Sequence, residues 1–383
     1  MKKSLVALAA LSAISAFADV DVSGGIKMYG VLDQAYLTQS VTRASTAAQS
    51  FSNSGFFAAG ATSRLGFKGE RDLGEGLKGF LQAEIQLDAD QAQLLPNKNR
   101  GTFVGLTKKE IGSVRLGTQE TLAYMLFGMD VNGRVEYKPQ VWRFTASADQ
   151  QDRMNNSVRF TTEKFQGFSA DFMMGSSEVT QGPSTTSSNN GDFKSIGINY
   201  DDHGALTAKF VMDTLTNTAG AYALPGEGNA GVLNKDATGY SSSLQKKTTY
   251  AAADQSNPLT RQMIGVSYKM EAATLNWIYA SSAVSGTGSL TTNTVGVRVP
   301  MDKITLAASV GSGTYSNSAA TIAGSVNDLT VGGYYNFDKS TSAYLLTSRG
   351  KNVVSAAGTA DANHTAGTTG ASTSTAIGVQ YKF

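Results

Sequence analysis

The chain contains no cysteine and only two histidines among its 383 residues. Without cysteine there is no disulfide framework, so a small cross-linked domain is excluded and a large cooperative structure or a membrane must stabilise the fold. We expect both histidines in exposed loops, because His203 precedes Gly204 and His364 lies in a stretch rich in Gly, Thr and Ala. The sequence therefore predicts no metal site, no cofactor and no enzymatic centre, which would need a nucleophile with its base.

Long hydrophobic runs are also missing. After residue 18 no uninterrupted apolar stretch approaches the ~20 residues that a transmembrane helix needs. The chain has 41 glycines and only 6 prolines, together with many Ser, Thr and Asn residues. This composition is wrong for a helical membrane protein and ordinary for a β-protein with polar loops. It also suits a membrane β-barrel, in which only alternate residues face lipid.

The first eighteen residues, MKKSLVALAALSAISAFA, predict a secretory signal peptide. Two lysines come first, an apolar stretch follows from residue 5, and Ala16 and Ala18 precede the expected cleavage point. We therefore expect residues 19–383 to form the folded domain. Loss of Lys2 and Lys3 lowers the Lys+Arg count from 32 to 30, equal to the 30 Asp+Glu. A neutral chain lacks the basic excess typical of nucleic-acid-binding proteins.

Apolar and polar residues alternate with a period of two along the whole chain, which predicts β-strands. The alternation places Lys27, Lys68 and Arg115 on polar faces. It is clearest in residues 26–33, 64–68, 81–87, 113–116, 195–200, 274–279, 294–299 and 377–383. A soluble β-sandwich could explain any one of these segments, with its polar side in water. It explains all of them poorly, because the inner faces would have to interlock into one very large core.

Connections of two lengths separate the alternating segments. Short turns are expected near residues 71–79, 107–113, 163–168, 201–205, 269–273, 300–303 and 337–341, and the longest polar stretches span 119–152, 214–258 and 350–372. Short turns at one end and long loops at the other are typical of an outer-membrane β-barrel. We predict an all-β fold, a transmembrane barrel of sixteen antiparallel strands with short periplasmic turns and long extracellular loops. Its strands start near residues 20, 61, 79, 99, 111, 153, 168, 193, 205, 259, 272, 290, 303, 327, 340 and 373.

A barrel of this size has room for a water-filled channel. Because the number of strands is even, both ends of the barrel domain fall at the short-turn end. The closing strand is then expected to pair with the first, near Val20, so that no unpaired edge meets hydrocarbon. Its last residue, Phe383, is expected in an interfacial aromatic girdle with Phe80, Tyr200, Tyr268 and Phe337.

Several stretches resemble a known family. They are MYGVLDQAY, SRLGFKGERDLGEGLKGFLQAEIQ, NRGTFVGLTKKEIGSVRLGTQET, DRMNNSVRFTTEKFQGFSADF and the closing GVQYKF. In this order the chain is similar to the general porins of Gram-negative outer membranes, particularly those of Neisseria and Burkholderia-like bacteria. The resemblance implies a homotrimer of barrels in contact with outer-membrane lipid and lipopolysaccharide, each barrel passing small hydrophilic solutes and ions by passive diffusion. It also implies that Phe383 helps the outer-membrane assembly machinery to recognise the chain.

The resemblance further implies a constriction between arginines of the wall and acids of an inward-folded third loop. Arg64, Arg100 and Arg153 match the wall positions, and the alternation independently puts them on polar faces. The inward loop would be residues 119–152, with the acids Asp130, Glu136, Asp149 and Asp152. For each arginine, structural pairing with a neighbouring carboxylate is the other interpretation.

A substrate-specific channel for sugars or anions is the alternative function. A sugar channel would present stacked aromatic side chains along its pore. The inward loop contains Tyr124, Phe127, Tyr137 and Trp142, which could serve that purpose or could pack the loop against the wall.

Overall fold

A computed structural model describes residues 20–23, 25–42, 51–57, 63–88, 93–95, 100–132, 153–175, 192–215, 234–236, 239–241, 258–284, 288–317, 323–356 and 369–383. The predicted signal peptide lies outside these residues. The strands are β1 (Val20–Ser23), β2 (Ile26–Thr42), β3 (Phe51–Phe57), β4 (Arg64–Gly74), β5 (Leu77–Asp88), β6 (Gln93–Leu95), β7 (Thr102–Lys108), β8 (Gly112–Glu120), β9 (Arg153–Thr162), β10 (Phe168–Gly175), β11 (Phe193–Asp201), β12 (Leu206–Leu215), β13 (Asn234–Asp236), β14 (Gly239–Ser241), β15 (Leu259–Lys269), β16 (Thr274–Val284), β17 (Gly288–Met301), β18 (Ile304–Asn317), β19 (Ala323–Asn336), β20 (Thr341–Ala356) and β21 (Thr369–Lys382).

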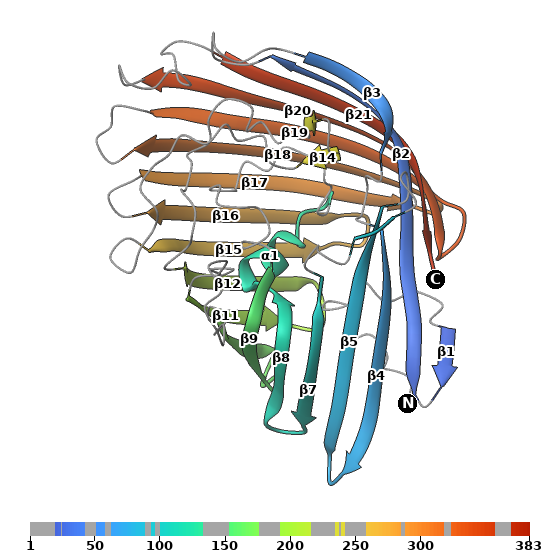
Figure 1. Cartoon of the computed structure of the whole chain (residues 1–383). Coiled ribbons are helices and arrows are strands. Elements are labelled where there is room, and N and C mark those ends of the chain that lie inside the picture. The colour runs from blue at the N-terminus through green and yellow to red at the C-terminus, as the bar shows by residue number, and fades with distance from the viewer. Residues whose placement is uncertain are drawn as a thin grey trace, which may run out of the picture.

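Sixteen of these strands form a closed antiparallel β-barrel, as predicted. They are β2, β4, β5, β7 to β12 and β15 to β21, and each pairs with the next. The short strands β3 and β6 pair beside β2 and β5, and β13 and β14 form a separate hairpin. In Figure 1 the strands β4, β5, β7 and β8 cross the direction of β15 to β20, as expected for opposite walls of tilted strands.

The barrel closes where β21 pairs with β2, in register from Val31↔Lys382 to Thr42↔Ala371. Beyond this register the Gly30 amide donates to the Phe383 carbonyl at 2.8 Å, and the Phe383 amide donates back to Gly30 at 3.1 Å. Closure is therefore confirmed, but the expected partner near Val20 is wrong. Residues 20–23 form the separate strand β1, which pairs with the start of β2 because the chain turns at Gly25, whose φ is 82°.

All seven predicted short turns are confirmed, and they lie at the same end of the barrel as Phe383. In the last of them Asp338 accepts the backbone amides of Thr341 at 2.6 Å and Ser340 at 2.7 Å. These two bonds lower the pKa of the Asp338 carboxyl. At the other end the strands are longer than predicted, since β20 reaches Ala356 and β21 begins at Thr369, inside the expected loop 350–372.

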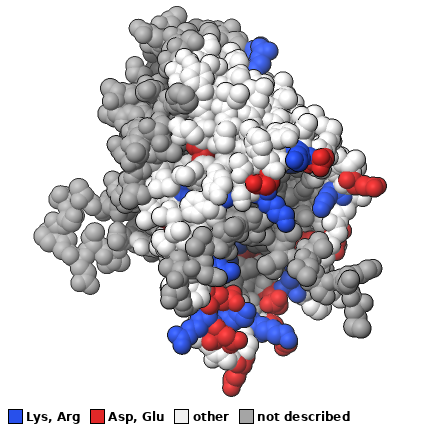
Figure 2. Space-filling model, turned by 90° about the vertical axis from the view of Figure 1, so that its right-hand side faces the viewer, with Lys and Arg blue, Asp and Glu red and all other residues white. Residues whose placement is uncertain are grey.

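The two faces of the wall follow the predicted alternation. Large apolar side chains such as Val104, Leu116 and Ile377 are more than half exposed on the outside of the barrel, where lipid would cover them. Their neighbours along each strand face inward. Figure 2 shows that charged residues of both signs gather at the lower end of the molecule, where Figure 1 places the hairpins β4–β5 and β7–β8.

The predicted aromatic girdle is only partly correct. Tyr268 and Phe337 are about half exposed near the short turns, at 49% and 55%. Tyr200 packs beside Phe168, with ring centroids 4.7 Å apart. Phe80 faces the interior instead, because it shares the face of Gln82 and Glu84 on β5, and its place in the girdle is wrong.

A short helix, α1 (Leu122–Phe127), lies inside the barrel. Thr121 caps it by accepting the Tyr124 amide at 3.2 Å, and Leu122 and Leu126 are buried against the inner face of β11, β12 and β15. The segment then continues along the wall to Asn132, whose side-chain amide donates a hydrogen bond to Ser309 Oγ at 2.9 Å. Among the described residues no helix is long and apolar enough to span a membrane.

Candidate functional site

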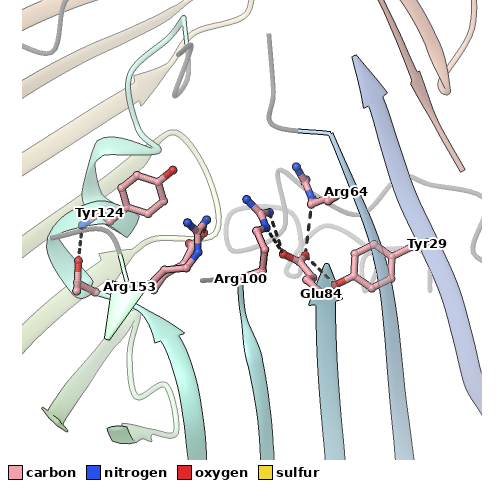
Figure 3. A network of polar contacts seen from close by, with 8 residues as sticks. Tyr29, Arg64, Glu84, Arg100, Tyr124 and Arg153 are labelled. Carbon is pink, nitrogen blue, oxygen red and sulfur yellow. Dashed lines mark hydrogen bonds and ion pairs between the residues drawn. The ribbon is translucent and has the colours of Figure 1, made fainter. Parts of the chain in front are cut away.

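The predicted wall arginines come together on the inner face, around a carboxylate that the sequence analysis did not single out. Glu84 of β5 accepts from Arg100 Nη2 at 2.8 Å and Nε at 3.1 Å. Arg64 Nε lies 3.7 Å from the same carboxylate, which also accepts the Tyr29 hydroxyl at 2.8 Å. Figure 3 shows Glu84 held between the two arginines and Tyr29.

Arg153 joins this group from the other side. Its guanidinium donates to Glu120 at 3.3 Å, and the Tyr124 ring of α1 lies 5.3 Å from its Cζ atom. Glu120 ends β8 and Arg153 begins β9, so their backbones are cross-strand neighbours. In the view of Figure 3, Arg153 lies on the side of α1 and Arg100 on the side of Glu84.

The carboxylates that contact the arginines among the described residues are therefore wall residues, Glu84 and Glu120. Of the four predicted loop acids only Asp130 is described, and its carboxylate accepts a hydrogen bond from the backbone N–H of Asn132 at 2.9 Å. Glu136, Asp149 and Asp152 lie outside the described residues. The alternation had already placed Glu84 on a polar face, so a search for acids of the same parity as the arginines would have found it.

The three further lumenal candidates also lie on the inner face, closer to the short turns. Lys27 and Lys68 are cross-strand neighbours, and the Lys68 ammonium lies 5.2 Å from the centre of the Tyr29 ring. Arg115 of β8 lies over two phenylalanine rings. We call Arg64, Arg100 and Arg153, with their carboxylate partners Glu84 and Glu120, the arginine group. The polar faces of β2, β4 and β8 thus carry a series of positive charges between this group and the short turns.

The sequence analysis missed two buried ion pairs of the inner wall. Arg159 Nη2 lies 2.7 Å from Asp171, and Arg261 Nη2 lies 2.7 Å from Asp213. All four side chains are at most 5% exposed. Each arginine is neutralised at short range, so these pairs fix neighbouring strands and add little net field to the lumen.

Two of the four loop aromatics are described. Phe127 is buried in the cluster between α1 and the wall, as expected for packing of the loop, whereas Tyr124 lies against Arg153. Tyr137 and Trp142 lie outside the described residues.

The family model and the curated relatives that match this chain indicate the same protein family. A family model described as Gram-negative porin matches residues 4–355. The major outer membrane protein P.IB of Neisseria gonorrhoeae is 32% identical over 212 residues, which are 53% of this chain and 55% of that protein. The outer membrane porin protein 32 of Delftia acidovorans is 36% identical over 182 residues, 45% of this chain and 49% of that protein. The chain thus spans about half the length of the curated relatives it matches.

Solved structures support the fold. The anion-selective porin from Comamonas acidovorans superposes with a TM-score of 0.67 at 20% identity, covering 94% of this chain and 99% of that one. Salmonella typhi OmpF in complex with daunomycin superposes with a TM-score of 0.59 at 16% identity, covering 94% and 98%. At these identities the likeness concerns the barrel architecture.

Proposed function

The chain belongs to the Gram-negative porin family, and on that premise we propose that it is a general diffusion channel of the outer membrane. Small hydrophilic solutes and ions would pass through its lumen without any bond chemistry. The observation that carries this proposal is the gathering of Arg64, Arg100 and Arg153 on the inner face of a closed barrel, beside the inward segment 121–132. Its place in the outer membrane follows from the family.

The arginine group would filter solutes by charge. Three guanidiniums share two wall carboxylates, which leaves one net positive charge among these five side chains. In a narrow space with low-dielectric walls such a charge attracts anions more strongly than it would in bulk water. Lys68 and Arg115 would extend the positive field toward the short-turn end.

The inward segment would filter by size. Its helix is fixed by apolar contacts, because Leu122, Leu126 and Phe127 are buried against the wall. Tyr124 points to the other side, toward Arg153. A passing solute would therefore travel between the inward segment and the wall of β2, β4, β5 and β7.

The partners are part of the proposal. A homotrimer is supported by the family and by a fold neighbour, OmpT of Vibrio cholerae, whose structure is described as a trimer form. Contact with outer-membrane lipid and lipopolysaccharide is supported by the exposed apolar residues of the outer face. The assembly machinery would recognise Phe383, the same residue whose backbone hydrogen bonds with Gly30 help to close the barrel.

Single-channel current through the detergent-extracted protein in a planar bilayer, under a salt gradient, tests the proposal. We expect large ohmic steps in groups of three and a mild ion preference. The triple variant R64Q/R100Q/R153Q should shift the reversal potential toward cation selectivity. A matched control, K78Q/K109Q/K339Q, removes three charges from exposed positions at the short-turn end. This control should leave the reversal potential unchanged.

Three results would contradict parts of the proposal. Unchanged reversal potentials in the triple variant would refute the role of the three arginines. A small conductance that one solute blocks saturably would favour the substrate-specific channel, and no conductance from correctly folded protein would refute the pore itself.

A further inference from the structure

Three residues in one row across β5, β7 and β8 form an unusual arrangement on the inner face. Gly105 lies between Phe80 and Arg115, as the cross-strand partner of both. A Cβ atom at Gly105 would lie 2.4 Å from Cζ of Phe80, so the Phe80 ring extends across β7 through the space that glycine leaves. The Arg115 guanidinium then lies 5.9 Å from the Phe80 ring centre and 5.3 Å from that of Phe103.

The two rings lie within the barrel and are only partly buried. Their centroids are 6.3 Å apart at an interplanar angle of 79°, an edge-to-face pair. Phe80 is four residues from Glu84 on β5, on the side of the short turns, so the pair lies below the arginine group. Apolar rings left partly open on a polar inner wall offer a surface that a ring-bearing solute could cover.

Arg115 differs from the other inner-wall arginines. Within the part of the chain that the structure describes, no carboxylate or carbonyl accepts a hydrogen bond from its guanidinium, whereas the other arginines of the inner wall contact Glu84, Glu120, Asp171, Asp213 or the Val131 carbonyl. Its neighbour in the row, Arg159, is instead neutralised by Asp171. A guanidinium has five N–H donors, and the contacts of Arg115 with two rings in place of a carboxylate leave donors available to a planar acceptor.

We propose that Arg115, Phe80 and Phe103 form a binding subsite for small aromatic carboxylates on the short-turn side of the arginine group. The carboxylate would accept two hydrogen bonds from Arg115, and the aromatic ring would pack against the exposed parts of the phenylalanine rings. A simple inorganic anion would be attracted by the Arg115 guanidinium but would not pack against the rings. A neutral sugar would not form an ion pair with Arg115. This subsite rests on the proposed channel function, because its ligand would reach it through the lumen.

Benzoate tests the subsite in two independent measurements. Isothermal titration calorimetry of the detergent-extracted protein measures its binding directly, and current block in a planar bilayer measures it during conduction. We expect saturable binding that R115Q weakens about tenfold, since the ligand would lose a charged hydrogen-bond donor. The double variant F80L/F103L, and acetate in place of benzoate, should each weaken binding about three- to tenfold, since ring packing is lost.

Two further variants separate the subsite from general electrostatics. K68Q removes a lumenal positive charge that lies over Tyr29, so it should reduce anion conductance while benzoate binding stays within about twofold. R115K keeps the charge and loses the planar fork, so it should bind benzoate more weakly than the native protein even where R115Q folds poorly.

Absent or non-saturable benzoate binding to the native protein would overturn the subsite, as would binding that R115Q leaves unchanged. Equal binding of acetate and benzoate would remove the role of the rings. Chloride conductance without benzoate binding would refute the subsite and leave the channel intact. Benzoate binding without any conductance would refute the channel and leave the subsite intact.

Discussion

Replacement of Glu84 tests the charge balance of the proposed pore most directly. Its carboxylate lies 2.8 Å from Arg100 Nη2 and 3.7 Å from Arg64 Nε, and its side chain is 9% exposed. Glu84→Gln preserves the shape of the side chain and removes the negative charge that two arginines share. We expect the channel to become more anion-selective.

The size of this effect follows from Coulomb's law. A unit charge in water interacts by about 0.7 kcal/mol with an ion ~6 Å away, the distance we expect for an ion passing beside the carboxylate. A Debye length of about 10 Å at 0.1 M salt reduces this to ~0.4 kcal/mol. Anion occupancy then rises about twofold and cation occupancy falls about twofold, so the anion-to-cation permeability ratio rises about fourfold.

The assay is the reversal potential across a salt gradient, at low and at high mean salt. The shift should disappear near 1 M salt, where the Debye length is only about 3 Å. Glu70→Gln is the matched control, because its carboxylate is 58% exposed, pairs with Lys78 and belongs to the row of Phe80. That row is four residues, or about 13 Å along the strand, from Glu84. An E84Q reversal potential equal to that of E70Q would refute the reasoning.

Three further predictions concern the wall. Gly265 makes room for α1, since a Cβ atom there would lie 3.1 Å from Cδ2 of Leu126 in the helix and 2.8 Å from Sδ of Met129 just after it. Gly265→Leu should therefore push the helix into the lumen and lower single-channel conductance, and unchanged conductance would contradict this. Asp213→Asn removes the carboxylate that pairs with the buried Arg261, so it should reduce the free energy of unfolding by about 3–5 kcal/mol in urea titrations. A loss below ~1 kcal/mol would contradict this. A Cβ atom at residue 30 would lie 2.4 Å from Cζ of Phe383. Gly30→Val should therefore displace the Phe383 ring and lower the yield of folded barrel on unheated gels. An undiminished yield would contradict this and show that the ring can move aside.

The strands were predictable because the pleat imposes a period of two residues on a wall with one apolar face. That period requires no knowledge of the neighbouring strand, so the alternation gave the inner positions of Arg64 and Arg115 as well as the sixteen segments. The alternation also places Phe80 on the inner face, with Gln82 and Glu84. The assignment of Phe80 to the girdle was wrong because it was based on the aromatic character of the residue and not on its place in the alternation.

Register was not predictable from the same pattern. The pairing of Glu84 with Arg100 depends on how far two strands are displaced against each other, and bulges change that displacement locally. The register of β8 and β9 shifts between Gly117 and Gln119, near Asn156 with its φ of 48°, and this shift brings Glu120 opposite Arg153. No local signal in the sequence fixes such offsets. The sequence therefore predicted the arginines of the site but not the wall carboxylates that contact them.

The division of the inner wall explains why the proposed filter can act on charge. The described part of the inward segment packs through Leu122 and Leu126 against Met263 and Ile278 of the wall, so apolar contacts hold it in place. The opposite side carries the arginine group, with fewer carboxylates than guanidiniums among its five charged members. An ion that passes between the inward segment and the arginine group lies in a narrow space with low-dielectric walls, and such walls strengthen the attraction of the charges that line the space. Selectivity should therefore depend on the apolar packing of α1 as well as on the arginines themselves.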